Sequence, residues 1–495
     1  MFGFEKCTPE SVGVSSAEIL KLFKTLDEYQ LSTHSLIIAK GKKIIAEAYY
    51  EPFHRDFLHR MYSVTKSFMA ISLGLAQDEG LLSLDDKFVK YFPEYENENW
   101  NDLLRQMTLR DMLTMETSRA EECYWFNEEP IDRNLAYFKQ KMGRISGTLY
   151  EYDSAGSYML GVIVEKVTGK PFLEYLKEKV LCKIGFGENA YCLKCPGGYS
   201  WSDSGILCSA RDLLTFARFV ANKGEWDGVQ YISREFMETA ASPLVDNDIY
   251  GHAAYNHCGY GYQIWGSFNG GFMFNGMGDQ FAIYDPKSDL ILVINSDNQG
   301  NTTSRPILFH EFCFRLARSA QEGALPEDAA AQKELEDYIS SRKLMSLKGR
   351  TENPFADEIG GVTYKLEKNP MGMEWIRFDF GKDGRSTLSY KNAQGEKKLI
   401  FGMGYNEFSK FPQEGYSDMI GNISVPGHKY DCAVSGIWTE DRKLRLKVQV
   451  IDKYFGNVGM TFSFKDKRVG VRMIKSAEAF LSEYDGNAVG MRADL

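Results

Sequence analysis

One stretch limits the folds open to this chain more than any other. Residues 63–77 are almost all apolar or small, so a helix formed here has hardly any polar face. A helix of this kind is buried on nearly all sides and needs other elements packed around it. Gly80, which follows Asp78 and Glu79, provides a place for the helix to stop. The sequence therefore predicts a domain organised around one central, buried helix.

The first turn of this helix carries two reactive side chains, Ser63 and Lys66. They are three residues apart, so a repeat of about 3.6 residues places them on one face, one turn apart. Burial and the positive end of the helix dipole both disfavour a charged lysine, so we expect the pKa of Lys66 to fall. A neutral lysine beside a hydroxyl is a general base beside a nucleophile. The pair therefore suggests nucleophilic catalysis.

The same spacing occurs a second time in the chain, at Ser340 and Lys343. This second copy closes a polar helix, where basic residues simply suit the negative end of the helix dipole. The spacing alone thus also arises by chance. Only the apolar setting separates Ser63 from Ser340.

Composition and charge bound the class of protein. At 495 residues the chain suggests two or three domains, and 43% apolar with 25% charged residues allows ordinary packed cores. The net charge of -10, without a Lys/Arg run, argues against nucleic acid or an anionic membrane as a partner. No secretory signal and no stretch of about 18 apolar residues is visible, so no membrane span is expected.

The cysteines indicate the redox environment. Their number is odd, nine, and they are scattered, which fits a reducing cytoplasm better than a disulfide framework. Cys192 and Cys195 form one Cys-x-x-Cys, but no second pair completes a zinc pattern. We expect free thiols there, no metal, and a cytoplasmic protein.

Periodicity along the chain predicts an α+β domain. Two early strands are expected at 34–39 and 43–50, followed by a helical middle that includes 156–167 and 213–222. Three or four late strands follow, and the sheet is expected to join the two ends of the segment. These late strands are predicted at 260–266, 271–275, 280–285 and 289–295.

Beyond this domain the pattern changes twice. Residues 326–343 read as a charged amphipathic helix, and after about residue 355 alternating β-rich runs dominate. We therefore expect a catalytic domain over 1–320, a helical connector over 321–354, and an antiparallel β domain over 355–495. A small barrel or a sandwich would satisfy the last pattern.

A proton carrier is expected just before the helix at 156–167, where Tyr152 and Ser154 stand. Beside a cationic Lys66, the pKa of a phenol would be pulled down, so that it relays a proton. The alternative is that Tyr152 is only a half-buried packing residue at a helix entrance.

A Gly-rich bend at 274–280 (FNGMGDQ) is the third notable segment. Glycine allows a backbone N–H to approach a bound acyl group closely, as an oxyanion hole requires. The alternative is an ordinary β-bulge or hairpin.

These three segments, in this order, resemble the serine β-lactamase and penicillin-binding-protein superfamily. The nearest likeness is to its class C-like branch of esterases, D-aminopeptidases and 6-aminohexanoate-dimer hydrolases. It covers roughly residues 8–318, and the segments that carry it are RMYSVTKS at 60–67, YDS at 152–154, SARDL at 209–213, YGYQIW at 260–265 and GMGDQ at 276–280. The resemblance implies an antiparallel sheet flanked by helices, a helical subdomain, and an active site between them.

The resemblance also implies roles for individual residues. Ser63 would be the acylated nucleophile, Lys66 its base and Tyr152 the second proton carrier. The backbone N–H groups of Ser63 and Met277 would form the oxyanion hole. No metal or organic cofactor is implied. Residues placed by the resemblance at the substrate are Ser154, Asn275 and Gly276.

Two departures from the family pattern bear on the substrate. The family's Lys-Thr-Gly or His-Thr-Gly triplet reads Phe274-Asn275-Gly276, so the group that helps bind a carboxylate is missing. Ser154 replaces an asparagine amide of the Tyr-x-Asn motif. We therefore expect a serine hydrolase for a small ester or amide. The alternatives are a D-amino-acid amidase or peptidase, a weak β-lactamase, and a non-catalytic penicillin-binding-like sensor.

Overall fold

The computed structural model describes residues 3–96, 100–120, 132–248, 254–417 and 424–493. By its internal contacts the described chain divides into two compact units, the first ending at Lys343 and the second beginning at Leu344. The charged helix expected before the β domain, α12 (Ala329–Ser340), counts with the first unit. The division into a catalytic domain ending at residue 320, a connector, and a β domain beginning at residue 355 stays a prediction.

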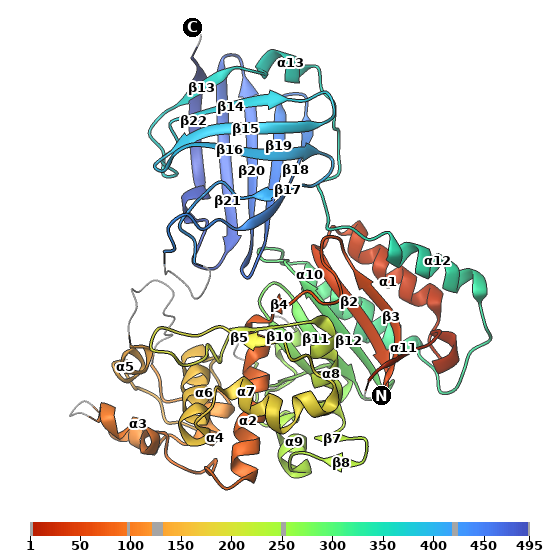
Figure 1. The fold of residues 1–495 in the computed structure, drawn as a ribbon, viewed down its shortest axis with the longest axis vertical. Coiled ribbons are helices and arrows are strands. Elements are labelled where there is room, and N and C mark those ends of the chain that lie inside the picture. The colour runs from red at the N-terminus through yellow and green to blue at the C-terminus, as the bar shows by residue number, and fades with distance from the viewer. Residues whose placement is uncertain (1–2, 97–99, 121–131, 249–253, 418–423, 494–495) are drawn as a thin grey trace. The chain divides into compact units, whose positions relative to one another are not determined.

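The first unit is built on a seven-stranded sheet with the order β1-β3-β2-β12-β11-β10-β9 (Figure 1). Neighbouring strands run antiparallel, except for β1 and β3, which are parallel. Strand β2, from the start of the chain, pairs with β12, from the end of this unit, so the sheet joins both ends as expected. The strands are β1 (Glu5–Lys6), β2 (Thr33–Lys40), β3 (Lys43–Tyr49), β9 (Trp265–Gly266), β10 (Phe272–Gly276), β11 (Gln280–Asp285) and β12 (Leu290–Ser296).

Helices flank this sheet, as Figure 1 shows. The helix α8 (Ala210–Ala221) packs on β2, β11 and β12, while α1 (Ser16–Glu28) shares a separate apolar core with the sheet and α12. All seven residues of β12 are buried, because both of its faces are covered. This apolar core around α1 also contains residues from α10 (Ser304–Phe309), from a π-helical segment (His310–Leu316) and from α11 (Ala317–Ser319).

A helical subdomain surrounds α2 (Thr65–Asp78), which a short 3₁₀ turn, η2 (Tyr62–Val64), precedes. Every residue from Thr65 to Ala76 is buried, which confirms the central buried helix. Gly80 follows the helix end in a left-handed conformation, with φ 73°. The further helices of this unit around α2 are α3 (Asp102–Gln106), α4 (Leu109–Leu113), α5 (Arg133–Phe138), α6 (Ser154–Thr168), α7 (Phe172–Lys179) and α9 (Arg234–Ala240). One small sheet consists of β4 (His59–Arg60), β6 (Ile206–Cys208) and β5 (Tyr191–Cys192), in this order. A second small sheet pairs β7 (Glu225–Trp226) with β8 (Val229–Gln230).

The second unit is a ten-stranded sheet whose sequential neighbours are antiparallel. A parallel pairing between β16 and β18 closes it into a barrel, so the structure has the barrel rather than the sandwich. Besides α13 (Phe355–Ile359), this unit contains β13 (Thr363–Leu366), β14 (Trp375–Phe380), β15 (Arg385–Asn392), β16 (Gly395–Met403), β17 (Glu407–Lys410), β18 (Asp431–Glu440), β19 (Lys443–Ile451), β20 (Phe455–Lys465), β21 (Arg468–Ala477) and β22 (Gly486–Arg492).

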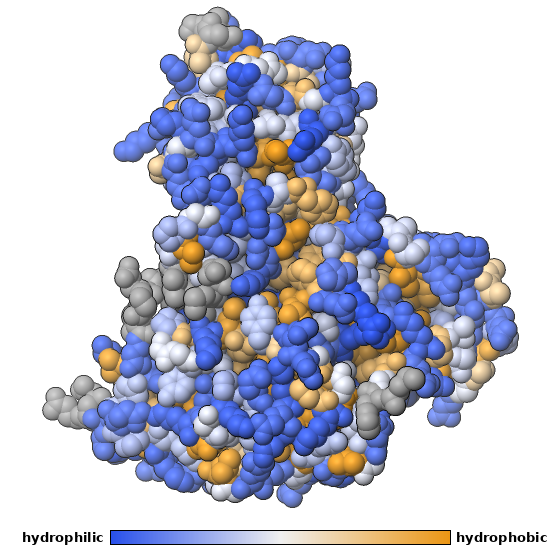
Figure 2. Space-filling model, in the orientation of Figure 1, coloured by the Kyte–Doolittle hydropathy of each residue, from blue (hydrophilic) through white to orange (hydrophobic). Residues whose placement is uncertain are grey.

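Alternation along these strands separates the inside of the barrel from its surface. In β14, for example, Ile376 and Phe378 are fully buried while Arg377 and Asp379 are exposed. The face drawn in Figure 2 is accordingly mainly hydrophilic over the upper part of the barrel. Large side chains fill the interior, and among them are Phe378, Leu388, Tyr390, Phe401, Leu446, Met460 and Phe462.

The α+β class and the following β domain are thus confirmed, with one local correction. The strand predicted over 260–266 is reduced to β9, because Gln263 adopts a left-handed φ of 56° and breaks the extended chain. The neighbouring aromatic residues Tyr124, Trp125 and Phe126, for which the sequence leaves both a pocket lining and simple local packing open, lie outside the described residues.

Candidate active site

The start of α2 brings Ser63 and Lys66 together. Lys66 Nζ lies 3.0 Å from Ser63 Oγ and donates a second hydrogen bond, of 2.8 Å, to the carbonyl oxygen of Asp203. Only 1% of Lys66 is exposed. A buried amine needs such partners, and here one of them is the hydroxyl that the sequence singled out. The geometry is that of a base within hydrogen-bond reach of a nucleophile.

The residue before Ser63 has an unusual backbone. Tyr62 is buried and has a left-handed φ of 48°. A bulky residue in this region costs on the order of 1–3 kcal/mol and persists only where its surroundings hold it. The turn that presents Ser63 is therefore held by tertiary contacts and not by local preference.

Tyr152 completes a group of three. Its side chain hydrogen-bonds to that of Ser63, and Lys66 Nζ lies 5.0 Å from the centre of its ring. The Tyr152 ring also stacks on Trp265 of β9, with ring centres 5.6 Å apart. The phenol is therefore held in place beside the Ser63 hydroxyl.

The expected fall in the pKa of Tyr152 is wrong. Burial raises the pKa of Tyr152 well above its usual value, and this effect outweighs the hydrogen bond to Ser63 and the positive charge of Arg305, which lower it. The phenol is consequently protonated at neutral pH. Tyr152 stands ready to donate a proton, not to accept one.

A buried ion pair fixes the start of α6, where Tyr152 and Ser154 stand. Asp153 Oδ1 accepts the Gly156 N–H at 2.8 Å and lies 2.8 Å from Arg119 Nη1, and both charged side chains are almost fully buried. Thr117 donates to the other carboxylate oxygen at 2.9 Å. This cap joins the α6 terminus to the preceding loop, so it sets the position of Tyr152.

The Gly-rich bend lies against the turn that carries Ser63. A Cβ atom on Gly276 would come within 2.4 Å of the Met61 carbonyl oxygen, so only glycine allows this approach. The buried Gln280 side chain donates from Nε2 to the Met277 and Ser296 carbonyls, at 2.9 and 2.6 Å. These contacts hold the bend, and with it Met277, beside η2.

Phe274, which the resemblance aligns with the cation of the family triplet, lies in an apolar cluster. Phe274 packs on Phe216 of α8 with ring centres 5.1 Å apart, and Phe216 stacks on Phe68 of α2 at 3.7 Å. The next residue of the triplet, Asn275, is buried in β10, while Ser154 is half-buried at the start of α6. The substrate roles of Asn275, Ser154 and Gly276 stay predictions.

Sequence reasoning missed two connections around the site. Lys66 contacts Asp203 through a backbone carbonyl, and no residue type signals such a contact. Gln263 joins α2 to α6, because its carbonyl accepts from Ser67 at 2.7 Å and its side chain from Ser157 at 2.6 Å. Only its place in the quoted YGYQIW segment pointed to Gln263.

Comparison with known proteins gives the family. Residues 19–310 match the family described as Beta-lactamase, which is more than half of the chain. The chain belongs to the beta-lactamase family. The resemblance stated from the motifs is thereby confirmed, whereas the roles of the individual site residues stay predictions.

Several members of the family are recognisably similar. A 6-aminohexanoate-dimer hydrolase of Paenarthrobacter ureafaciens is 23% identical over 53% of this chain and 71% of the relative. The solved structure of a putative 6-aminohexanoate-dimer hydrolase from Bacillus anthracis superposes with a TM-score of 0.53 at 18% identity, over 64% of this chain and 87% of that one. A putative beta-lactamase from Bacteroides dorei gives a TM-score of 0.51 at 15% identity, over 62% and 99%. These structures show a shared fold.

The cysteine pair lies near the site of this beta-lactamase-family protein. Burial raises the pKa of the Cys192 and Cys195 thiols, and Arg133 Nη1 donates to Cys195 Sγ at 3.0 Å. Both are free thiols. Within the described residues there is no cluster of His, Cys, Asp or Glu arranged to hold a metal. Over the same residues, no helix has the length and apolar character required to cross a bilayer.

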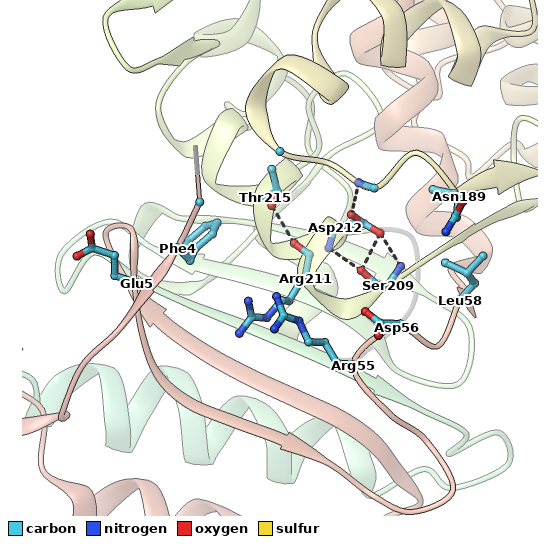
Figure 3. A pocket seen from close by; sticks show the side chains of 14 residues that line it. Phe4, Glu5, Arg55, Asp56, Leu58, Asn189, Ser209, Arg211, Asp212 and Thr215 are labelled. Carbon is cyan, nitrogen blue, oxygen red and sulfur yellow. Dashed lines mark hydrogen bonds between the residues drawn. The ribbon is translucent and has the colours of Figure 1, made fainter. Parts of the chain in front are cut away.

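Two cavities open on the first unit away from Ser63. One, of about 510 Å³, has Phe4, Arg55 and Arg211 around it, and Figure 3 shows the two guanidinium groups close together. The Asp212 carboxylate on the wall of this cavity already accepts hydrogen bonds from the backbone N–H and the hydroxyl of Ser209, which is the N-cap residue of α8. The other cavity, of about 490 Å³, lies between the strand β3 and the helix α12. None of the predicted site residues lines either cavity.

Proposed function

We propose that this protein is a serine hydrolase that cleaves a small ester or amide through an acyl-enzyme on Ser63. The observation that carries the proposal is the contact of 3.0 Å between the buried Lys66 Nζ and Ser63 Oγ, with the Tyr152 phenol bonded to the same hydroxyl. Membership of the beta-lactamase family supports it.

In the acylation step, Ser63 Oγ attacks the carbonyl carbon of the substrate and its proton moves to Lys66 Nζ. Lys66 acts in its neutral form, since only a free amine accepts a proton. The carbonyl becomes a tetrahedral oxyanion. We assign its stabilisation to the N–H groups of Ser63 and Met277, because Gly276 allows the bend to approach η2.

The collapse of this intermediate needs an acid for the leaving group. Tyr152 suits the task, because burial keeps its phenol protonated. The leaving group takes the phenolic proton, and the proton held by Lys66 then restores the phenol. For deacylation, a water molecule attacks the acyl carbon while the free amine of Lys66 accepts its proton. That proton then passes to Ser63 Oγ as the acyl–oxygen bond breaks.

The apolar side chain at the first position of the triplet, Phe274, bears on the class of substrate. Phe274 occupies the position of the family's cation and is buried in the cluster with Phe216 and Phe68. A charged group placed there would be desolvated, so this position does not bind a carboxylate. Neutral esters and small amides therefore fit better than β-lactams. A substrate panel should include p-nitrophenyl esters, D-aminoacyl amides, nitrocefin and the 6-aminohexanoate dimer.

Labelling with a fluorescent fluorophosphonate tests the nucleophile. The wild type should be labelled on Ser63, and Ser63→Ala should lose the label. Ser340→Ala is the matched control, because it removes the serine of the second Ser-x-x-Lys from an exposed position. Equal labelling of wild type and Ser63→Ala would overturn the proposal. Labelling without turnover of any ester or amide in the panel would instead support the sensor alternative.

A further inference from the structure

A buried arginine lies directly behind the candidate active site. Arg60, in β4, is fully buried, and β4 pairs with β6. Its guanidinium carbon lies 4.2 Å from the centre of the Tyr62 ring and 4.4 Å from that of Trp201. The guanidinium therefore packs closely against two aromatic rings, a geometry that is favourable for a desolvated cation.

The same guanidinium holds the segment to which Lys66 is bonded. Arg60 Nε donates to the Ser204 carbonyl at 3.2 Å, and Arg60 Nη2 donates to Ser204 Oγ at 3.2 Å. The neighbouring carbonyl, that of Asp203, accepts the hydrogen bond from Lys66. Two successive carbonyls are thus fixed by two cationic side chains of the same motif. Movement of Arg60 would move the acceptor that orients Lys66.

Arg60 also contacts the strained residue of the turn. Tyr62 keeps its left-handed backbone although it is bulky, so its side chain must be held by its neighbours. The stacking of Arg60 on the Tyr62 ring is one such contact, and Ser63 is the next residue. Arg60 therefore acts on both members of the pair, on Ser63 through Tyr62 and on Lys66 through the Asp203–Ser204 segment.

We propose that Arg60 is a positioning residue for acyl transfer, which holds Ser63 and Lys66 in contact and places a permanent positive charge behind Lys66. This inference rests on the proposed function, because it assigns Arg60 a part in the same reaction. Arginine suits the role better than lysine, since its planar fork makes two directed bonds to Ser204 while the guanidinium packs on the rings of Tyr62 and Trp201.

The charges around Lys66 fix the sign of the electrostatic effect. Arg60, Arg133 and Lys66 all lie near the Asp203 carboxyl, whose pKa burial raises and these three cations lower. The protonated phenol of Tyr152 adds no charge. Arg305, whose charge acts on Tyr152, is paired with Asp279 at 2.9 Å, while the guanidinium charges of Arg60 and Arg133 act on the Asp203 carboxyl. Removing the charge of Arg60 would favour protonated Lys66, so more alkaline solution would be needed to generate the free base.

The test compares Arg60→Gln with Arg60→Lys by the pH dependence of the fluorophosphonate labelling rate. Arg60→Gln should slow labelling by about 10- to 100-fold and move the acid limb of the profile upward by about one pH unit. Arg60→Lys keeps a charge but loses the fork, so it should slow labelling and leave the acid limb where it is. A residue that merely stabilises the fold would not separate these two variants.

Two further variants guard against a general loss of structure. Arg218→Gln removes another buried arginine, which pairs with Asp289 at the far end of β11, and it should lower the unfolding temperature without moving the profile. Trp201→Leu removes one ring from Arg60 and leaves its charge, so labelling should slow without a shift of the acid limb. Should Arg60→Gln fail to fold, Arg60→Lys and Trp201→Leu still test the positioning.

The outcomes separate this inference from the proposed function. If wild-type protein is not labelled at all, the proposed function fails. If the wild type is labelled on Ser63 while folded Arg60→Gln has the same rate and acid limb, only the role of Arg60 is overturned. A slower Arg60→Gln with an unmoved acid limb would overturn the electrostatic part and leave the positioning part standing.

Discussion

The chain contains the same four-residue pattern twice, and the two copies lie in opposite environments. Ser63 and Lys66 straddle the start of α2, and Lys66 is 1% exposed. Ser340 is the last residue of α12, and the side chain of Lys343, beyond the helix end, is 77% exposed. Lys66 donates to Ser63 at 3.0 Å, whereas Ser340 Oγ donates to the Asp337 carbonyl at 3.0 Å and Lys343 approaches Glu51 at 3.9 Å.

The difference teaches that spacing does not make a reactive pair. In water a lysine near an exposed carboxylate keeps its proton, and a serine at a helix end bonds to the backbone. In the buried copy, Lys66 is almost completely removed from water and bonds to the Ser63 hydroxyl and the Asp203 carbonyl. Chemistry thus depends on which end of a helix carries the pattern and on what covers that end.

The sharpest way to break this comparison is to remove each lysine. Lys66→Ala should lower kcat/KM for a p-nitrophenyl ester by about 10³- to 10⁴-fold, because the nucleophile loses its base. Lys343→Ala should leave kcat/KM within about twofold, since that side chain lies in solvent. Similar losses in the two variants would show that burial is not what distinguishes the copies.

A second prediction concerns Tyr152, for which the exposed copy has no counterpart. Tyr152→Phe keeps the ring stacked on Trp265 but removes the acid, so kcat should fall by about 10²- to 10³-fold. The loss should be smaller for esters with good leaving groups, such as p-nitrophenolate, which need no proton. An equal loss for p-nitrophenyl and alkyl esters would contradict proton donation to the leaving group.

The third prediction concerns the close approach of the bend to the Ser63 turn. Gly276→Ala places a Cβ within 2.4 Å of the Met61 carbonyl oxygen, so η2 and β10 must move apart. We expect about a 10-fold loss of kcat and a cost of about 1–3 kcal/mol in the free energy of unfolding. Gly459→Ala, where a Cβ meets nothing within 4 Å, is the matched control for activity and unfolding temperature.

Much of the fold was predictable, because local pattern and burial agree. The strand β11 begins and ends at the predicted residues, and β2, β3 and β12 differ from their predicted bounds by one residue at one or both ends. Prediction failed at 260–266, where the left-handed Gln263 serves the contact between α2 and α6 rather than a strand. Tertiary demand there overrides an alternating apolar pattern.

The site was predictable in its reactive groups and not in their support. A hydroxyl and an amine on one helix turn carry a chemical signature, whereas the contribution of Asp203 is a backbone carbonyl. The direction of the pKa shift of Tyr152 was also beyond the sequence. A nearby cation lowers a phenol's pKa and burial raises it, and only the packing on Trp265 and α2 decides which effect is larger.

The smallest expected effect concerns the pH dependence of stability, and it compares two histidines, one buried and one exposed, that are five residues apart. Burial lowers the pKa of His59 to about 3, while His54 is exposed. Unfolded His59 has an ordinary pKa near 6.5, so between about pH 6.5 and 3 the unfolded chain binds more protons. His59 therefore favours the fold above about pH 6.5, and this contribution is lost, by up to about 1.4 kcal/mol per pH unit, as the pH falls through that window.

His59→Gln should flatten this part of the stability profile, because an amide keeps hydrogen-bonding capacity towards His34 and the Arg60 carbonyl and cannot titrate. Unfolding temperatures measured from pH 7 to 4 should then fall less steeply than in the wild type. His54→Gln is the matched control and should leave the slope unchanged, since this side chain is exposed to solvent and loses no packing. An unaltered slope in His59→Gln would mean that other groups, not the buried imidazole beneath the Ser63 turn, dominate acid unfolding.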